Sequence, residues 1–285
     1  MPSSSRLGRW VEEQMRRGSA KTTEIIARRM GDHFGMYVGC GFPKSGTVWL
    51  CRLMSSYLGM PFPQNYAMPV AMRAVVHAHW DHHPELPPTV YVYRDGRDVM
   101  VSLFNHHMRQ ITTQRHPRGA AKTLDRYRRL FGPSFDPARA MAEPRPYLAT
   151  FVEAEFDEPA QGKRSWSAHV RDWLGEPHEN VTPVSYEALK LNTVAAFSDL
   201  MKGVTGEPPD ARLVELAVAR HDFALSSGRR PGDMDPTNPL RKGIVGDWRN
   251  HFTRDAAAAF HEHAGHELVT LGYEPDGSWV DLVES

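Results

Sequence analysis

The sequence predicts an α/β protein in which helices flank a central, mostly parallel β-sheet. Short apolar runs that are typical of buried strands occur at 36–40, 74–76, 89–93 and 180–185. Helical patterns follow most of these runs, so strands and helices alternate along the chain. Parallel strands need a long crossover between them, whereas antiparallel strands are often joined by a tight turn. The alternation therefore favours a parallel sheet covered on both faces.

The first expected strand leads into a loop and then a helix. The run 36–40 enters a turn-rich stretch at 41–47, and the apolar segment 48–54 has the density and length of a buried helix. Residues 8–30 precede them with a charged helical pattern, which Gly18 weakens. This strand–loop–helix arrangement is the first place to look for a binding site.

The later elements repeat the alternation of strands and helices. The strand at 89–93 is followed by a helix, and the strand at 180–185 is followed by two more. The later helices are expected at 99–108, 186–202, 210–221 and 254–271.

Two stretches do not fit this alternation. Residues 109–165 contain six prolines and many arginines, and they predict irregular helices and loops. Residues 226–246 contain four glycines and three prolines with almost no apolar periodicity. Loops of such length in a compact protein are usually functional or disordered. No internal repeat or persuasive linker divides the chain, so we expect residues 1–285 to form one domain.

The composition excludes several classes of protein. Of the 285 residues, 41% are hydrophobic and 24% are charged, which excludes a disordered or collagen-like chain. The formal net charge is +0, so the overall field does not favour nucleic acid as a partner. No apolar stretch approaches the roughly 18 residues that would span a membrane. The two cysteines make no disulfide framework, so we expect a cytoplasmic protein.

The loop after the first strand has the features of an anion site. Backbone N–H groups at a helix start point outward, and the helix dipole favours negative charge there. Gly39 to Ser45 is similar to the nucleotide-binding pattern GxxxxGK(S/T), but it is one residue shorter and Pro43 stands where the second glycine should be. Proline has no N–H donor, so this loop cannot wrap a triphosphate in the usual way. The alternative is a helix start with ordinary capping residues.

The wider segment 43–49, which reads PKSGTVW, resembles the 5′-phosphosulfate loop of the cytosolic-type sulfotransferases, PKSGTTW. One position differs, because Val48 replaces a threonine and removes one hydroxyl donor. That family takes its sulfuryl group from 3′-phosphoadenosine 5′-phosphosulfate (PAPS) and releases 3′-phosphoadenosine 5′-phosphate (PAP). The resemblance implies that the phosphosulfate end is bound by Pro43, Lys44, Ser45, Gly46, Thr47, Val48 and Trp49.

Two further segments, in the expected order, support the resemblance. Residues 94–102 look like the family's 3′-phosphate segment, with Arg94 and Ser102 eight positions apart. Residues 241–253 are similar to its C-terminal RKGxxGDWKNHFT segment almost throughout. The three matches cover most of the chain, although 109–165 matches nothing in the family pattern. The nucleotide-binding residues that these segments and the fourth strand imply are Arg94, Ser102, Tyr186, Arg241, Lys242 and Gly243.

These residue types suit a donor with anions at both ends. Arginine and lysine carry permanent charge, and serine and glycine offer short donors to phosphate. Trp49 lies one turn into its helix, where an indole could stack on adenine. The alternatives are plain core packing for Trp49 and Tyr186, and a surface salt bridge for Arg94.

A histidine with a pKa near neutrality suits removal of a proton from an acceptor hydroxyl. By the resemblance, His79 falls on the catalytic base and His77 replaces the family's lysine, while Lys44 stabilises charge on the leaving phosphate. Alternate histidines on a strand face the same side, so His77 and His79 could instead bind a metal together. We expect no metal. The pairs His106–His107 and His261–His263 are expected to be solvated.

Two other functions share the phosphate loop. A magnesium-dependent nucleotide kinase would use Asp95, after the strand at 89–93, to hold the metal. A non-catalytic nucleotide-binding module would keep the phosphate residues and would not need His79. Pro43 in the loop and the unexplained Arg94 argue against the kinase.

The favoured interpretation is a sulfotransferase that acts on a hydroxyl of a small molecule, with neither nucleic acid nor membrane as a partner. Segments 60–75, 109–165 and 226–240 are expected to shape the acceptor pocket. Aromatic residues in and near these segments favour an apolar alcohol or phenol as acceptor; they are Phe62, Tyr66, Phe104, Tyr127, Phe131, Phe135, Tyr147 and Phe151. Many relatives in the family form dimers through a C-terminal motif KxxxTVxxxE. Here the motif keeps Thr253, but Arg254 and Ala258 replace its valine and glutamate. We therefore expect a monomer, or a dimer through another surface.

Overall fold

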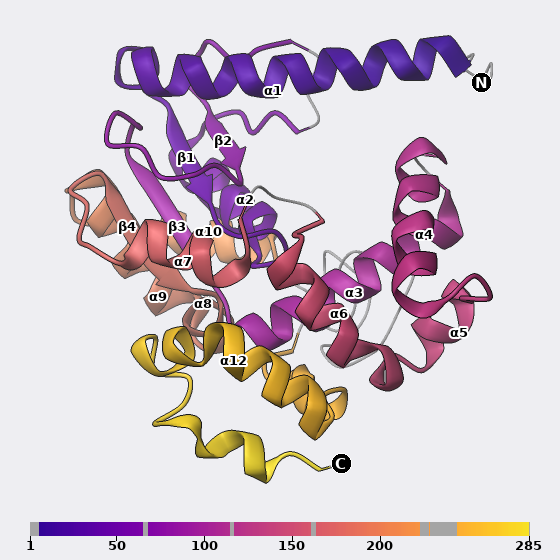
Figure 1. Ribbon diagram of the computed structural model, residues 1–285. Coiled ribbons are helices and arrows are strands. Elements are labelled where there is room, and N and C mark those ends of the chain that lie inside the picture. Colours follow the sequence, from indigo (N-terminus) through magenta and orange to yellow (C-terminus); the bar gives the residue numbers. More distant parts are fainter. Residues whose placement is uncertain are drawn as a thin grey trace. The chain divides into compact units, whose positions relative to one another are not determined.

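The computed structural model describes residues 6–64, 68–114, 117–160, 164–222, 228 and 244–284 (Figure 1). The chain divides into two compact units. The first comprises 1–93 and 172–222, and the second comprises 94–171 and 223–285. That residues 1–285 form a single domain stays a prediction.

The first unit contains a four-stranded sheet in which every pairing is parallel. Its strands lie in the order β2-β1-β3-β4. They are β1 (Tyr37–Cys40), β2 (Val75–Ala78), β3 (Thr89–Tyr93) and β4 (Val181–Ser185). Pro183 is tolerated in β4 because this strand lies at the edge of the sheet, where a missing N–H leaves no ladder bond unmade. The predicted α/β fold with a parallel sheet is confirmed.

Alternating side chains of the strands build a core on each face of this sheet. Val90 and Val92 pack with α2 (Thr47–Leu58), α9 (Thr193–Thr205) and α10 (Ala211–Arg220). Tyr91, between the two valines, faces the other core.

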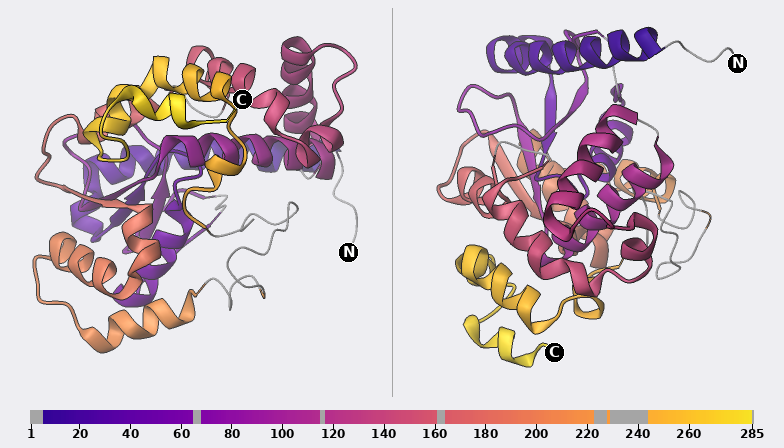
Figure 2. Two further views of the ribbon diagram at one scale, coloured as in Figure 1. Left: turned by 90° about the horizontal axis from the view of Figure 1, so that it is seen from below. Right: turned by 45° about the vertical axis from the view of Figure 1, so that its right-hand side comes forward.

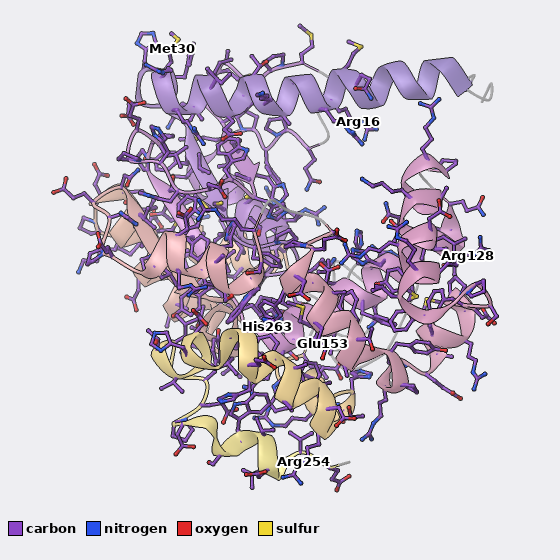
Figure 3. The ribbon with its side chains drawn as sticks, in the orientation of Figure 1. Arg16, Met30, Arg128, Glu153, Arg254 and His263 are labelled. Carbon is purple, nitrogen blue, oxygen red and sulfur yellow. The ribbon has the colours of Figure 1, made fainter. Side chains whose placement is uncertain are left out.

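That second core covers the opposite face of the sheet. It contains Tyr91, Trp173 and Ala27 of the long helix α1 (Arg6–Phe34). On α1, Met30 is 44% exposed and points away from the strands (Figure 3). Both faces of the sheet are therefore covered, as the buried strand pattern predicts.

The second unit is helical and centred on α3 (Gly96–Thr113). Figure 2 shows α4 (Pro117–Phe131), α5 (Pro137–Ala142) and α6 (Arg145–Asp157) gathered around it. The remaining elements of the described chain are α7 (Trp166–Leu174), α8 (Tyr186–Leu191), the 3₁₀ helices η1 (Asp247–Asn250) and η2 (Gly277–Leu282), and α12 (Arg254–Thr270). No helix of the described chain is long and apolar enough to cross a bilayer.

The region 109–165 is more regular than its proline content suggests. Pro117 and Pro137 are the first residues of α4 and α5, and Pro146 lies in the first turn of α6. Proline is favoured at helix starts because its fixed φ fits there and its missing N–H would have no partner. These three prolines therefore mark where helices begin, and the expectation that the helices of this region would be irregular was wrong.

The aromatic residues of this region form the core of the second unit. Phe104, Tyr127 and Phe151 are 0% exposed, and their ring centroids lie between 5.2 and 6.2 Å apart. Phe131, Phe135 and Tyr147 pack around them. These six rings stabilise the fold, so their presence in the sequence is not evidence for an acceptor pocket.

The expectation of a solvated His106–His107 pair was wrong for its second member. His107 is 1% exposed, and its Nδ1 lies 3.0 Å from the hydroxyl of Tyr127. The side of α3 that carries His107 is covered by α4, which places a hydrogen-bonding partner against the ring.

Candidate functional site

The loop between β1 and α2 has the backbone of an anion-binding turn. Lys44 has φ 76° and Gly46 has φ 95°, so both lie in the left-handed region. Gly46 is the N-cap residue of α2, and no side chain caps the helix there. The first N–H groups of a helix have no partner within it. A side chain at Gly46 would place Cβ 2.7 Å from Cδ2 of Tyr186, so only glycine fits this turn.

Two hydroxyl groups of this loop are buried without a hydrogen-bond partner among the described residues. They are Ser45 Oγ and Thr47 Oγ1, in residues that are 0% and 3% exposed. Most buried polar groups in proteins are hydrogen-bonded, so an orphaned pair is an exception that needs a cause. Both hydroxyls can donate, and Lys44 adds a positive charge beside them. The loop therefore fits the phosphosulfate end of the donor.

Trp49 packs at the edge of the first unit's core and keeps part of its ring exposed. Its Nε1 donates to the carbonyl oxygen of His221 at 3.1 Å, and its ring meets Tyr186 edge-on with centroids 6.0 Å apart. Lys190 Nζ lies 5.9 Å from the ring centroid. Trp49 and Tyr186 thus pack against the core beside the phosphate loop, and their contact with the nucleotide stays a prediction.

The contact with His221 is one that sequence reasoning missed. His221 follows α10 and also lies 2.7 Å from the hydroxyl of Ser56 through its Nε2. Because Trp49 and His221 are 172 positions apart, no local pattern could have paired them.

His79 lies directly after β2, and one of its ring nitrogens is hydrogen-bonded to the phosphate loop. Its Nδ1 is 2.5 Å from the carbonyl oxygen of Gly41. A carbonyl oxygen only accepts hydrogen bonds, so Nδ1 carries the proton and Nε2 keeps its lone pair. This is the tautomer that a general base needs.

The pKa of His79 also favours the neutral base. Although part of its surface is exposed, the surrounding protein lowers the pKa below the usual 6.5 by disfavouring the charged form. The hydrogen bond to Gly41 raises the pKa, and the positive charge of Lys44 lowers it. At neutral pH the imidazole is therefore uncharged.

His77, on β2, is also uncharged at neutral pH. Burial lowers the pKa of His77 to about 3, and the neighbouring His79 lowers it as well. The two rings meet edge-on with centroids 4.6 Å apart. His77 therefore cannot supply the charge of the lysine that it replaces. The described residues contain no group of three or more His, Cys, Asp or Glu able to hold a metal.

In the second unit, Arg94 follows β3 and is bound by groups from two segments. Its Nη2 lies 3.1 Å from Asp98 Oδ2 and 3.4 Å from the carbonyl oxygen of Ile244. Ser102 lies further along α3, partly exposed. Arg94 does form a salt bridge, as the alternative predicts, but the pair is largely buried, with side chains that are 13% and 0% exposed. Its role toward the nucleotide stays a prediction.

Asp95 is committed to structural contacts. It is 5% exposed, caps α3 by accepting from the N–H of Arg97 at 2.9 Å, and accepts from the Arg97 guanidinium at 2.8 Å. The guanidinium in turn lies over the rings of both Trp248 and Trp279, 3.9 and 4.5 Å from their centroids. A carboxylate engaged in this way is not arranged to hold the metal of a nucleotide kinase.

Three predicted nucleotide residues, Arg241, Lys242 and Gly243, lie outside the described residues. The same holds for Tyr66 and for most of the segment 226–240. Their assigned roles stay predictions.

Comparisons with known proteins identify the family of this chain. The sulfotransferase domain model matches residues 68–272. Human sulfotransferase 2B1 is 24% identical over 236 residues, which cover 77% of this chain and 62% of the relative's length. The 3-beta-hydroxysteroid sulfotransferase of Cavia porcellus is 26% identical over 267 residues, covering 82% and 83% of the two chains.

Solved structures show the same fold. The mouse sulfotransferase SULT7A1 complexed with PAP has a TM-score of 0.59 at 18% identity, covering 92% of this chain and 93% of that one. A retinol dehydratase in complex with androsterone and PAP has a TM-score of 0.51 at 15% identity, covering 82% and 80%. Because the family model spans most of the sequence, the chain belongs to the sulfotransferase family, whose sulfuryl donor is PAPS.

Proposed function

We propose that this protein transfers a sulfuryl group from PAPS to a hydroxyl of a small, apolar or phenolic acceptor. The observation that carries the proposal is the phosphate loop of the first unit. There, two buried hydroxyls without a described partner and the Lys44 charge accompany a histidine, His79, whose tautomer is set by the loop itself. An anion site beside a neutral base is what transfer to an alcohol requires.

PAPS supplies a sulfuryl group attached to a phosphate that leaves with negative charge. The N–H groups at the start of α2 and the hydroxyls of Ser45 and Thr47 would bind this end of the donor. Lys44 would neutralise the charge on the leaving oxygen. By the family resemblance, Arg94 and Ser102 would bind the 3′-phosphate.

His79 would accept the proton of the acceptor hydroxyl at Nε2. The hydrogen bond from Nδ1 to Gly41 orients the ring during this transfer and favours the imidazolium that forms, since a carbonyl oxygen attracts positive charge. The same bond links the base to the loop that binds the donor.

The proposed acceptor class rests on the relatives. Their printed names include hydroxysteroid sulfotransferases, and one structural neighbour binds androsterone. We therefore propose an apolar alcohol or phenol, and a cytoplasmic location. Incubation of the purified protein with labelled PAPS and a panel of phenols, alcohols and amines tests both the activity and the acceptor class. Labelling of amines alone would contradict the proposal.

The absence of the family's C-terminal dimer is also part of this proposal. Thr253 caps α12 by accepting from the N–H of Ala256, and Arg254 pairs with Asp281 of the same chain. Both motif positions are therefore engaged within one chain, which supports a monomer or a dimer through another surface.

PAP should stabilise the fold, and adenosine 5′-monophosphate should do so far less. A ligand at 100 times its Kd adds about 2.7 kcal/mol to the free energy of unfolding, and only PAP carries the 3′-phosphate that Arg94 and Ser102 are proposed to bind. Thermal denaturation with each nucleotide at equal concentration measures the difference. Equal shifts in Tm would remove the 3′-phosphate assignment.

Excess EDTA should leave turnover almost unchanged. Lys44 and backbone N–H groups occupy the role that Mg²⁺ has in a kinase, and Asp95 is bound to Arg97. Initial rates with and without EDTA, followed by added Mg²⁺, make the measurement. Loss of activity that Mg²⁺ restores would favour a kinase.

A further inference from the structure

Asp98 is a fully buried carboxylate in the first turn of α3, and its side chain is 0% exposed. Three donors contact it. Oδ2 accepts from Arg94 Nη2 at 3.1 Å and from the N–H of Gly246 at 2.9 Å, and Oδ1 accepts from the N–H of Trp248 at 2.9 Å. One side chain of the second unit thus joins Arg94, the start of α3 and a segment almost 150 positions away in the sequence.

Burying a carboxylate is unfavourable unless charge and hydrogen bonds compensate it. The Arg94 guanidinium, the two backbone N–H groups and the positive end of the α3 dipole provide that compensation here. Such a cluster has one geometry, because every oxygen is directed at a donor. The consequence for Arg94 is that its long side chain is held in one position before any ligand arrives, which lowers the entropy lost on binding.

We propose that Asp98 is a positioning residue that fixes Arg94 for the 3′-phosphate and so determines the preference for 3′-phosphorylated nucleotides. The inference rests on the proposed function, in which Arg94 binds that phosphate. Asp98 touches neither donor nor acceptor and acts through Arg94. Neither the nucleotide pattern nor the phosphate segment of the sequence singles it out.

The test compares Asp98→Asn with Arg94→Gln and with Asp95→Asn as a matched control. Asp95 is also a buried carboxylate at the start of α3 with an arginine partner, but that partner is Arg97. Calorimetry gives the Kd of each protein for PAP and for adenosine 5′-monophosphate. The ratio of the two values isolates the 3′-phosphate, whereas a general loss of stability would affect both nucleotides.

In Asp98→Asn the affinity for PAP should fall about tenfold or more, with little change for the monophosphate, since a charge-assisted contact to Arg94 is lost. Arg94→Gln should reduce the preference at least as much. In the Arg94→Gln background, Asp98→Asn should have no further effect on the ratio, because it acts through Arg94. Asp95→Asn should keep the wild-type ratio even if its Tm falls.

Two results would overturn the inference, and they differ. A wild-type ratio in Asp98→Asn, with the preference lost in Arg94→Gln, would refute the role of Asp98 and leave the proposed function intact. A wild-type ratio in Arg94→Gln would refute the 3′-phosphate assignment and the role of Asp98 with it. If circular dichroism shows that Asp98→Asn does not fold, Asp98→Glu replaces it, because it keeps the charge and displaces the carboxylate by one methylene.

Discussion

Replacing His79 with alanine should lower kcat by about 10²–10⁴-fold and leave the Kd for PAP almost unchanged. The expectation follows from the ring's position: Nδ1 donates to Gly41, and Nε2 is the nitrogen that can accept a proton. Alanine removes the base without touching the hydroxyls of Ser45 and Thr47. Steady-state kinetics with saturating donor and acceptor, together with calorimetric titration of PAP, separates the two effects.

The pH dependence of kcat/KM should follow the protonation of His79. Activity requires the neutral ring, so kcat/KM should be lost as the pH falls through the pKa of His79, which lies below 6.5. The matched control is His77→Ala. Because the pKa of His77 is about 3, His77 does not change charge over the pH range in which His79 titrates. His77→Ala should therefore still lose kcat/KM at low pH, as the wild type does. A near-normal kcat in His79→Ala, with loss of activity in His77→Ala, would show that the base is His77.

Replacing Lys44 with methionine should lower kcat by about 10²–10³-fold, as removal of one preorganised group that stabilises transition-state charge does in other enzymes. Charge on the leaving phosphate develops only as the sulfuryl group departs, so the effect on kcat should exceed the effect on the Kd for PAP. Kinetic constants and PAP titration of the same preparation provide the comparison.

Methionine is chosen because the backbone at Lys44 has φ 76°. Any side chain with a Cβ carries the same strain there, so methionine removes the charge and leaves the backbone cost as it is. Lys44→Arg is the control, since it keeps the charge. If the methionine variant turned over as fast as wild type, or lost only PAP affinity, Lys44 would have no role in the chemical step.

Much of the first unit could be predicted from local patterns. The runs at 36–40, 89–93 and 180–185 each contain an observed strand. The first two are apolar almost throughout because β1 and β3 are buried on both faces, whereas the edge strand β4 is only partly buried. The region 109–165 could not be predicted as well. Its prolines indicate turns in isolation, and only the packing of α4, α5 and α6 against α3 makes them helix starts.

The candidate site also has a part that could be predicted from the sequence and a part that could not. His79, Lys44 and the hydroxyls of the loop were identified from short segments, whose residue types and order are a local property. The contact of Trp49 with His221 and that of Asp98 with Gly246 join residues 172 and 148 positions apart. No periodicity or spacing records such pairs, since they form only when the intervening chain has folded.

The sequence by itself determined the fold class, and it singled out the candidate phosphate loop and the candidate histidine, because strand burial, helix starts and short motifs depend on neighbouring residues. Only the tertiary structure decided which nitrogen of His79 carries the proton, since that depends on the carbonyl of Gly41 on another strand's loop. It also decided that Asp95 is a structural partner of Arg97 and that Asp98 holds Arg94. An aspartate is the same residue in the sequence whether it binds a metal or forms an ion pair. Only the groups that surround its carboxylate after folding distinguish the two.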